Sequence, residues 1–89
     1  MEVTYQLFYT KNAIKDIRKL KSAKLVEKAK TLCELLSNNP FPAHSKQLIG
    51  DMKGRYSIRI NLKHRLVYEV FTDKKIVKIL SMWSHYGGN

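Results

Sequence analysis

The chain has 89 residues, of which 17 are Lys or Arg and seven are Asp or Glu, giving a formal net charge of +10. A chain of this length builds one small domain around one modest core. No apolar run approaches the roughly 20 residues of a membrane span. The first ten residues alternate in polarity, unlike a signal peptide. The positive charge favours a polyanionic partner, namely nucleic acid, an acidic protein or an anionic membrane.

The cysteine and histidine content argues against a metal or a disulfide. The one cysteine, Cys33, lies in an apolar helical pattern and cannot form an internal disulfide. A buried structural thiol of this kind suits a reducing cytoplasm. The three histidines, His44, His64 and His85, match no common zinc spacing. No Gly-rich loop precedes a helix. We therefore expect a cytoplasmic protein without metal or cofactor.

The chain begins with a predicted strand followed by a predicted helix. Residues 2–9 alternate between apolar and polar side chains, which is the period of a strand. Thr10 is suited to cap the helix that follows. Over residues 11–21 apolar side chains recur every three or four positions, which predicts an amphipathic helix. Its expected apolar stripe consists of Ala13, Ile14, Ile17 and Leu20.

A second amphipathic helix is predicted over residues 23–37, with Ser22 as its N-cap. The run Asn38-Asn39-Pro40 ends it, because proline cannot continue a helix. Residues 38–54 contain two prolines and two glycines and show no sustained period. A loop of this length in a small domain is often functional.

Three further strands are predicted over residues 55–61, 65–71 and 76–83. Short polar links join them, so consecutive strands should pair antiparallel. The predicted order is β-α-α-β-β-β, an α+β fold in which the helical hairpin packs on one face of an antiparallel sheet. We expect one domain over residues 1–86 and a flexible tail over residues 87–89.

Two arginines lie on the predicted strands rather than in loops. Arg59 and Arg65 fall near the join between two paired strands, where they alternate with apolar residues. An arginine on a rigid sheet can hold a phosphate through two hydrogen bonds at a low ordering cost. The alternative is that each arginine pairs with an acid across the sheet, such as Glu69. His85 and Tyr86 follow at the end of the last strand.

These residue types can cut RNA without a metal. The ribose 2′-hydroxyl can attack its own phosphate if one group takes its proton and another protonates the leaving 5′-oxygen. Histidine, with an unperturbed pKa of about 6.5, can serve either purpose near neutral pH. Arginine stabilises the charge that develops on the phosphate. An aromatic ring can stack on a base and fix the nucleotide.

Two segments resemble a known family. They are NPFPAHSKQLIGDMKGRYSIRINLKHRLVYEV (residues 39–70) and KIVKILSMWSHY (residues 75–86). Their Asn-Pro-Phe, Leu-x-Gly-x-x-x-Gly, Arg-Ile-Asn, His-Arg-Leu-Val-Tyr and closing His-Tyr elements are similar to the Txe/YoeB branch of the RelE/ParE superfamily of toxin–antitoxin toxins. The preceding predicted strand and two helices fit the same layout.

The resemblance implies an endoribonuclease that binds the 70S ribosome, cuts mRNA in the decoding site and is held inactive by an acidic cognate antitoxin. It implies no membrane partner. By the same resemblance His85 matches the general acid and Arg65 the arginine at the scissile phosphate. Arg59 matches a second basic active-site residue, and Tyr86 completes the site. The implied RNA-binding residues are Lys46, Lys53, Arg55, Lys63 and His64.

The chain departs from the family pattern at the general base. A glutamate usually stands two residues before the leucine of the loop motif, and this position is Lys46. A lysine cannot replace a carboxylate unless its pKa falls far. Four alternatives are open: a neutral Lys46, His44, Tyr86 as a phenolate, or proton loss to water. The strand motif also reads Ser57-Ile58-Arg59 where Ser-Arg-Arg is usual.

Two other functions fit parts of the sequence. A ParE-like inhibitor of DNA gyrase would keep the fold, but it has no need of Arg65 with a terminal His-Tyr. A catalytically weakened relative that still binds an antitoxin or nucleic acid is favoured by Lys46.

Overall fold

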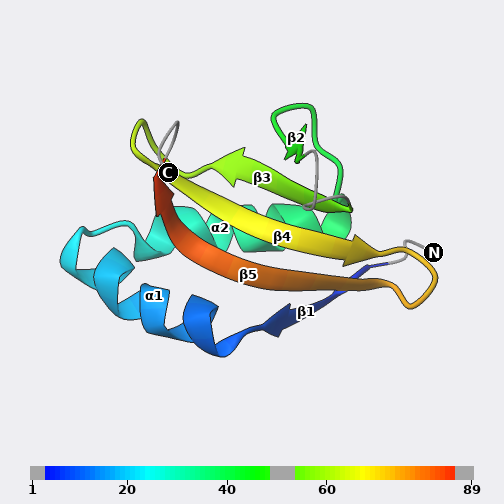
Figure 1. The fold of residues 1–89 in the computed structure, drawn as a ribbon, viewed down its shortest axis with the longest axis horizontal. Coiled ribbons are helices and arrows are strands. Elements are labelled where there is room, and N and C mark those ends of the chain that lie inside the picture. The colour runs from blue at the N-terminus through cyan, green and yellow to red at the C-terminus, as the bar shows by residue number, and fades with distance from the viewer. Residues whose placement is uncertain (1–3, 49–53, 86–89) are drawn as a thin grey trace.

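The fold is seen in a computed structural model that describes residues 4–48 and 54–85, the last two by their backbone alone (Figure 1). The described strands form one sheet in the order β1-β5-β4-β3-β2. Both helices pack on the same face of this sheet (Figure 1). The elements are β1 (Gln6–Tyr9), α1 (Lys11–Ser22), α2 (Val26–Asn38), β2 (Lys46–Gln47), β3 (Arg55–Arg59), β4 (His64–Phe71) and β5 (Ile76–His85).

The predicted α+β class and the helical hairpin on one face of the sheet are confirmed. Strands β2 to β5 pair antiparallel with their neighbours, as short links require. Two features differ from the prediction. The helical hairpin returns the chain so that β1 pairs parallel with β5, from Gln6 opposite Ile76 to Tyr9 opposite Ile79, which makes the sheet mixed. The loop predicted over residues 38–54 also contains the two-residue strand β2.

The core lies between the helices and the inward face of the sheet. From His64 to Tyr68, β4 buries every second residue, and in its pairing with β3 Leu66 lies opposite Ile58 and Tyr68 opposite Tyr56. The rings of the second pair stack with centroids 5.8 Å apart. Burying each large apolar side chain contributes about 1.5–3 kcal/mol. The remaining buried apolar residues come from both helices and β5: Ala13, Leu20, Ala29, Cys33, Leu36, Val77, Ile79 and Met82.

The helices confirm one predicted cap and correct two other details. Thr10 caps α1, and its hydroxyl accepts the Ala13 N–H at 3.0 Å. Ser22 does not cap α2, because it is the last residue of α1 and α2 starts after Leu25 without a side-chain cap. Ile14 is 55% exposed rather than part of the core stripe. The buried polar residue of α1 is Asp16, whose carboxylate accepts a hydrogen bond from β5.

Candidate active site

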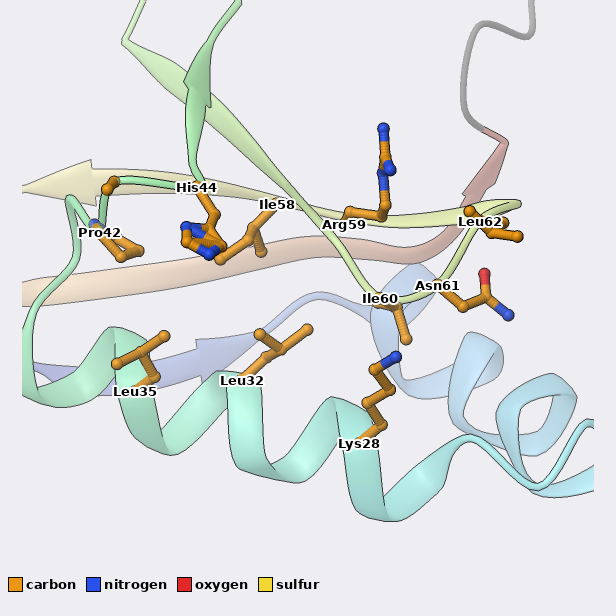
Figure 2. A pocket seen from close by; sticks show the side chains of 11 residues that line it. Lys28, Leu32, Leu35, Pro42, His44, Ile58, Arg59, Ile60, Asn61 and Leu62 are labelled. Atoms are coloured by element: carbon orange, nitrogen blue, oxygen red, sulfur yellow. The ribbon is translucent and has the colours of Figure 1, made fainter.

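Arg59 and Arg65 occupy directly facing positions on β3 and β4. Their neighbours Ile58 and Ile60 point inward to the helices. Figure 2 shows the Arg59 side chain directed away from α2 and the Ile60 side chain directed toward it. Both arginines therefore lie on the face of the sheet opposite the helices. Two guanidinium groups in facing positions of an antiparallel pair concentrate positive charge at one point of the sheet, which favours the binding of an anion there.

A small cavity of about 180 Å³ lies beside this pair. Strand β2 brings Lys46 opposite Ser57, and the turn before β2 brings His44. No carboxylate is among the described residues that line the cavity, so its potential is positive. The lining residues are His44, Lys46, Ser57, Arg59 and Arg65. The structure thus brings together three of the predicted site residues, Lys46 and the two arginines, and adds His44 and Ser57.

The last strand reaches the same end of the sheet. Ser84 lies opposite Arg65 and His85 lies opposite His64 in the pairing of β5 with β4. In Figure 1 the end of β5 rises toward the turn between β3 and β4. The backbone of the predicted acid is therefore next to the arginine pair. The side chain of His85, together with the predicted residues Tyr86 and Lys53, lies outside the described residues.

His64, one of the predicted RNA-binding residues, is a buried residue of β4. Its side chain is buried, with 8% of the residue exposed, and its ring stacks on Trp83 with centroids 3.9 Å apart. The residue thus offers RNA little surface, and its described contact joins β4 to β5. The turn before it is ordered by Asn61, whose side-chain oxygen accepts the N–H groups of Lys63 at 2.9 Å and His64 at 2.7 Å. Lys63 is exposed, so its side chain can be reached by a polyanion.

Arg55 and Glu69 form an ion pair across β3 and β4, with Arg55 Nε 3.8 Å from Glu69 Oε1. Both side chains are partly exposed, so the pair contributes little to stability. Glu69 thus faces Arg55, four residues along β3 from Arg59. The predicted alternative, in which Glu69 pairs with an arginine of the site, is not the arrangement seen here.

The loop before β2 is held by aromatic side chains from the sheet. Tyr68 donates a hydrogen bond from its hydroxyl to the Pro40 carbonyl at 2.8 Å. Burial raises the pKa of Tyr68, which keeps this donor protonated. Phe41 packs edge-on against Tyr56 at 5.2 Å. Together these contacts fix the segment that carries His44. The Asn-Pro-Phe motif marked this loop in the sequence, but a two-residue strand has no period that predicts β2.

A larger, apolar groove of about 620 Å³ adjoins the cavity and shares His44 and Arg59 with it. Figure 2 shows that Leu32 and Leu35 point from α2 toward β3, with Lys28 at one end. The groove is lined by Lys28, Leu32, Leu35, Pro42, Ala43, His44, Ile58, Arg59, Ile60, Asn61 and Leu62. Sequence reasoning did not find it, because it forms between residues that are distant in the chain.

Within residues 4–48 and 54–85, no helix is long and apolar enough to cross a membrane. In the same described residues, no group of three or more His, Cys, Asp or Glu side chains is placed to hold a metal ion.

Solved structures with the same fold define the class of protein. The YoeB/ParE toxin from Agrobacterium tumefaciens is 29% identical, with a TM-score of 0.81 over 91% of this chain and 99% of that one. The YoeB-YefM complex from Staphylococcus aureus gives 29% identity and a TM-score of 0.76 over 92% and 98%. The toxin-antitoxin complex RelBE2 from Mycobacterium tuberculosis gives 27% and 0.75 over 92% and 99%. This class is the RelE/ParE superfamily of toxins, and the chain is YoeB-like within it.

The particular family follows from the sequence profile of the ParE toxin of type II toxin-antitoxin systems, parDE, which matches residues 7–86. The chain belongs to this family and is a toxin of a type II toxin–antitoxin system. The predicted superfamily is thereby confirmed. Among curated protein sequences, none matches the chain.

Proposed function

We propose that this toxin is a ribosome-dependent endoribonuclease that cleaves mRNA by attack of the ribose 2′-hydroxyl on the adjacent phosphate. The observation that supports this most is the facing pair Arg59 and Arg65 beside a cavity without described carboxylates. A protein that only binds another protein has no need of two arginines at facing positions of paired strands. The proposed setting is the cytoplasm, where translating ribosomes and message occur together.

The reaction assigns one task to each group. A base removes the 2′-hydroxyl proton, and the 2′-oxygen then bonds to phosphorus. The bond from phosphorus to the 5′-oxygen breaks, and His85 gives that oxygen a proton. The products are a 2′,3′-cyclic phosphate and a free 5′-hydroxyl. Arg59 and Arg65 bind the two non-bridging oxygens and stabilise the extra charge of the transition state. Tyr86 stacks on or positions the nucleotide.

We assign the general base to His44. A base must lie within hydrogen-bond reach of the proton that it takes. His44 lines the same cavity as both arginines, on a loop fixed by Tyr68. Lys46 lines the cavity too and, as a cation, stabilises the phosphate instead. This division of roles lets a lysine stand where the family usually has a carboxylate.

The test maps mRNA 5′ ends in cells that express the toxin, Arg65→Ala or His85→Ala. Codon-phased cuts that both variants lose support the proposal. Arg18→Ala is the matched control, because Arg18 is an exposed arginine on α1, away from the cavity. Intact message with DNA damage would instead support a gyrase inhibitor. Intact message without a growth defect would support a catalytically weakened relative, the reading that Lys46 favours.

The proposed partners are a cognate acidic antitoxin, the 70S ribosome and mRNA. Solved relatives include a toxin with YefM and the RelBE2 toxin-antitoxin complex. The apolar groove with Lys28 and Arg59 at its rim suits an acidic amphipathic segment, whose apolar side chains fill the groove while its acids meet the cations. Such a segment would cover Arg59 and so block the phosphate site.

The groove is tested with Leu35→Asp, a change on its exposed wall. We expect the variant to keep its mRNA cleavage but to escape neutralisation by the antitoxin encoded beside it. Ile14→Asp is the control, because Ile14 is similarly exposed but lies on α1, outside the groove. Full neutralisation of Leu35→Asp would place the antitoxin elsewhere.

A further inference from the structure

Strand β5 departs from a regular ladder at two points. Tyr68 pairs with Ile79 and Val67 with Ser81, so Leu80 is an extra residue on β5. Between the pairs Val67–Ser81 and Arg65–Ser84, β4 has one intervening residue and β5 has two. Such bulges bend a strand and leave backbone groups without their ladder partners. Both occur shortly before the end of β5 that carries His85.

The start of α1 supplies partners for these backbone groups. Strand β1 stops pairing with β5 at Tyr9 and Ile79. Beyond that point the Thr10 N–H donates to the Ile79 carbonyl at 3.1 Å, and the Thr10 hydroxyl donates to the Leu80 carbonyl at 2.9 Å. The Met82 N–H then donates to Asp16 Oδ2 at 2.9 Å. We call Thr10 and Asp16 the α1 clamp, because they continue the edge of β1 with side chains.

The burial of Asp16 requires a hydrogen-bond partner such as the Met82 N–H. It is 4% exposed, and a buried carboxylate is costly unless its oxygens accept hydrogen bonds. Its other oxygen lies 3.9 Å from Lys19 Nζ, which is too long for a strong ion pair. The backbone hydrogen bond to Met82 is therefore the principal described contact of the carboxylate. It reaches across 66 residues of sequence to the second bulge of β5.

The residues after the clamp lead directly to the proposed site. Trp83 follows Met82 and stacks on His64, and Ser84 and His85 then pair with Arg65 and His64. A shift of β5 at Met82 would move all three of these residues together. An error of about 1 Å in the position of a catalytic group can cost 100-fold in rate.

We infer that Thr10 and Asp16 are positioning residues, which hold the bulged part of β5 so that its last residues lie beside Arg65. The consequence for catalysis rests on the proposed nuclease function. The effect of the clamp on the position of β5 does not rest on that function, because it can be measured in the free toxin through the stacked rings of His64 and Trp83. A simple packing role for Asp16 would lower stability without moving those rings in the molecules that remain folded.

The experiment compares Asp16→Asn with Asp16→Leu in the full chain. Asparagine keeps a carbonyl oxygen that can accept the Met82 N–H, whereas leucine has a similar volume and no acceptor. Lys19→Met is the control, because it removes the weak ion pair and leaves the hydrogen bond to Met82. Thr10→Ser and Thr10→Val form a second pair, in which only serine keeps the hydroxyl that caps α1 and donates to Leu80.

Two readouts are taken on folded protein. The first is the set of nuclear Overhauser contacts between the rings of His64 and Trp83, which is the one tryptophan of the chain. The second is steady-state cleavage of ribosome-bound mRNA, with kcat and KM measured separately. We expect Asp16→Leu to lose the ring contacts and to lower kcat about 100-fold, with KM within about threefold. Asp16→Asn and Lys19→Met should keep the contacts and most of kcat.

The results separate the two levels of the proposal. If Asp16→Leu keeps both the ring contacts and kcat, or loses kcat with the contacts intact, the positioning role is overturned. Loss of the contacts without loss of kcat would overturn the catalytic consequence. If Asp16→Leu does not fold, Thr10→Val against Thr10→Ser decides by the same criteria. If the unmodified toxin cuts no mRNA, the proposed function fails, and the ring contacts still test the clamp.

Discussion

The two faces of the β3–β4 hairpin carry different kinds of side chain. The face toward the helices, here called the back face, is apolar, and the opposite face, the front face, carries the two arginines. On the face toward the helices, Ile60 is fully buried, and Ile58 packs opposite Leu66. On the other face, the two positively charged residues Arg59 and Arg65 occupy facing positions. Adjacent residues of β3 thus lie on opposite faces, since Ile58 is buried in the core and Arg59 is exposed on the other side. Rigid apolar packing behind the sheet lets the front face hold like charges in place for an anion.

The largest expected effect is on the front face. Arg65→Ala should lower the single-turnover rate of mRNA cleavage about 1,000-fold, since one donor to a developing oxyanion is typically worth 100- to 1,000-fold. The free energy of unfolding should fall far less than in Ile60→Ala, because Arg65 lies on the face of the sheet opposite the core. Urea unfolding and the cleavage assay are run on the same sample, with Arg18→Ala as control. A large loss of stability in Arg65→Ala would contradict the division between the faces.

The reverse change is made on the back face. Ile60→Ala should lower the free energy of unfolding by about 2–5 kcal/mol, because it leaves a cavity in the core. The cleavage rate per folded molecule should remain within about twofold. Ile14→Ala, at a 55% exposed position, should change stability by less than about 0.5 kcal/mol. The distinction between the two faces is wrong if Ile60→Ala lowers the cleavage rate by a larger factor than it lowers the fraction of folded protein.

The assignment of the base is tested at His44, which lies where the two cavities meet. His44→Ala should lower the cleavage rate about 100-fold, the lower end of the range for general acid–base catalysis. Imidazole added to the assay should restore part of the rate in this variant and none in Arg65→Ala. Equal rates for His44→Ala and the unmodified toxin would return the role to Lys46, Tyr86 or water.

The smallest expected effect is a loss of folding stability at high pH. Burial raises the pKa of the Tyr68 hydroxyl, and burial with the Cys33 thiol nearby raises the pKa of Tyr9 to about 12. A raised pKa means that the folded state keeps its proton longer, so the associated stability is present below the ordinary value of about 10. It is lost as the pH rises toward 12. Urea unfolding between pH 8 and 11 should show the decline.

Tyr68→Phe provides the matched comparison. At pH 8 it should cost about 1 kcal/mol, because the Pro40 carbonyl loses its donor. Between pH 9 and 11 it should lose less stability than the unmodified protein. A parallel decline in both proteins would exclude Tyr68 as a source of the alkaline loss.

The faces of the hairpin could be predicted from the sequence, because period two over residues 55–61 and 65–71 places Ile58 and Arg59 on opposite sides. The helices followed from apolar spacing, although Ser22 offered a cap that α2 does not use. Strand β2 could not be predicted, since two residues have no period. These successes and failures share one cause, which is that local patterns report only on local neighbours.

In the candidate site, too, only the features that depend on nearby residues could be predicted. The arginine pair could be predicted from strand alternation and a short turn. The burial of His64 could not, because it depends on Trp83 from another strand. Asp16 interrupts an apolar helical stripe and would be expected on the surface. Its partner is the Met82 N–H, which lies at a β-bulge, and no pattern of residues in the sequence predicts that bulge.

The parallel pairing of β1 with β5 has a consequence for how a newly made chain matures. Gln6–Tyr9 are synthesised 70 residues before their partners Ile76–Ile79. Closing such a long loop is slow in folding, and β5, which lies between β1 and β4 in the sheet, is made after both of them. The proposed cutting site therefore cannot assemble on a nascent chain until translation has passed residue 79, which delays its action on the message that encodes it.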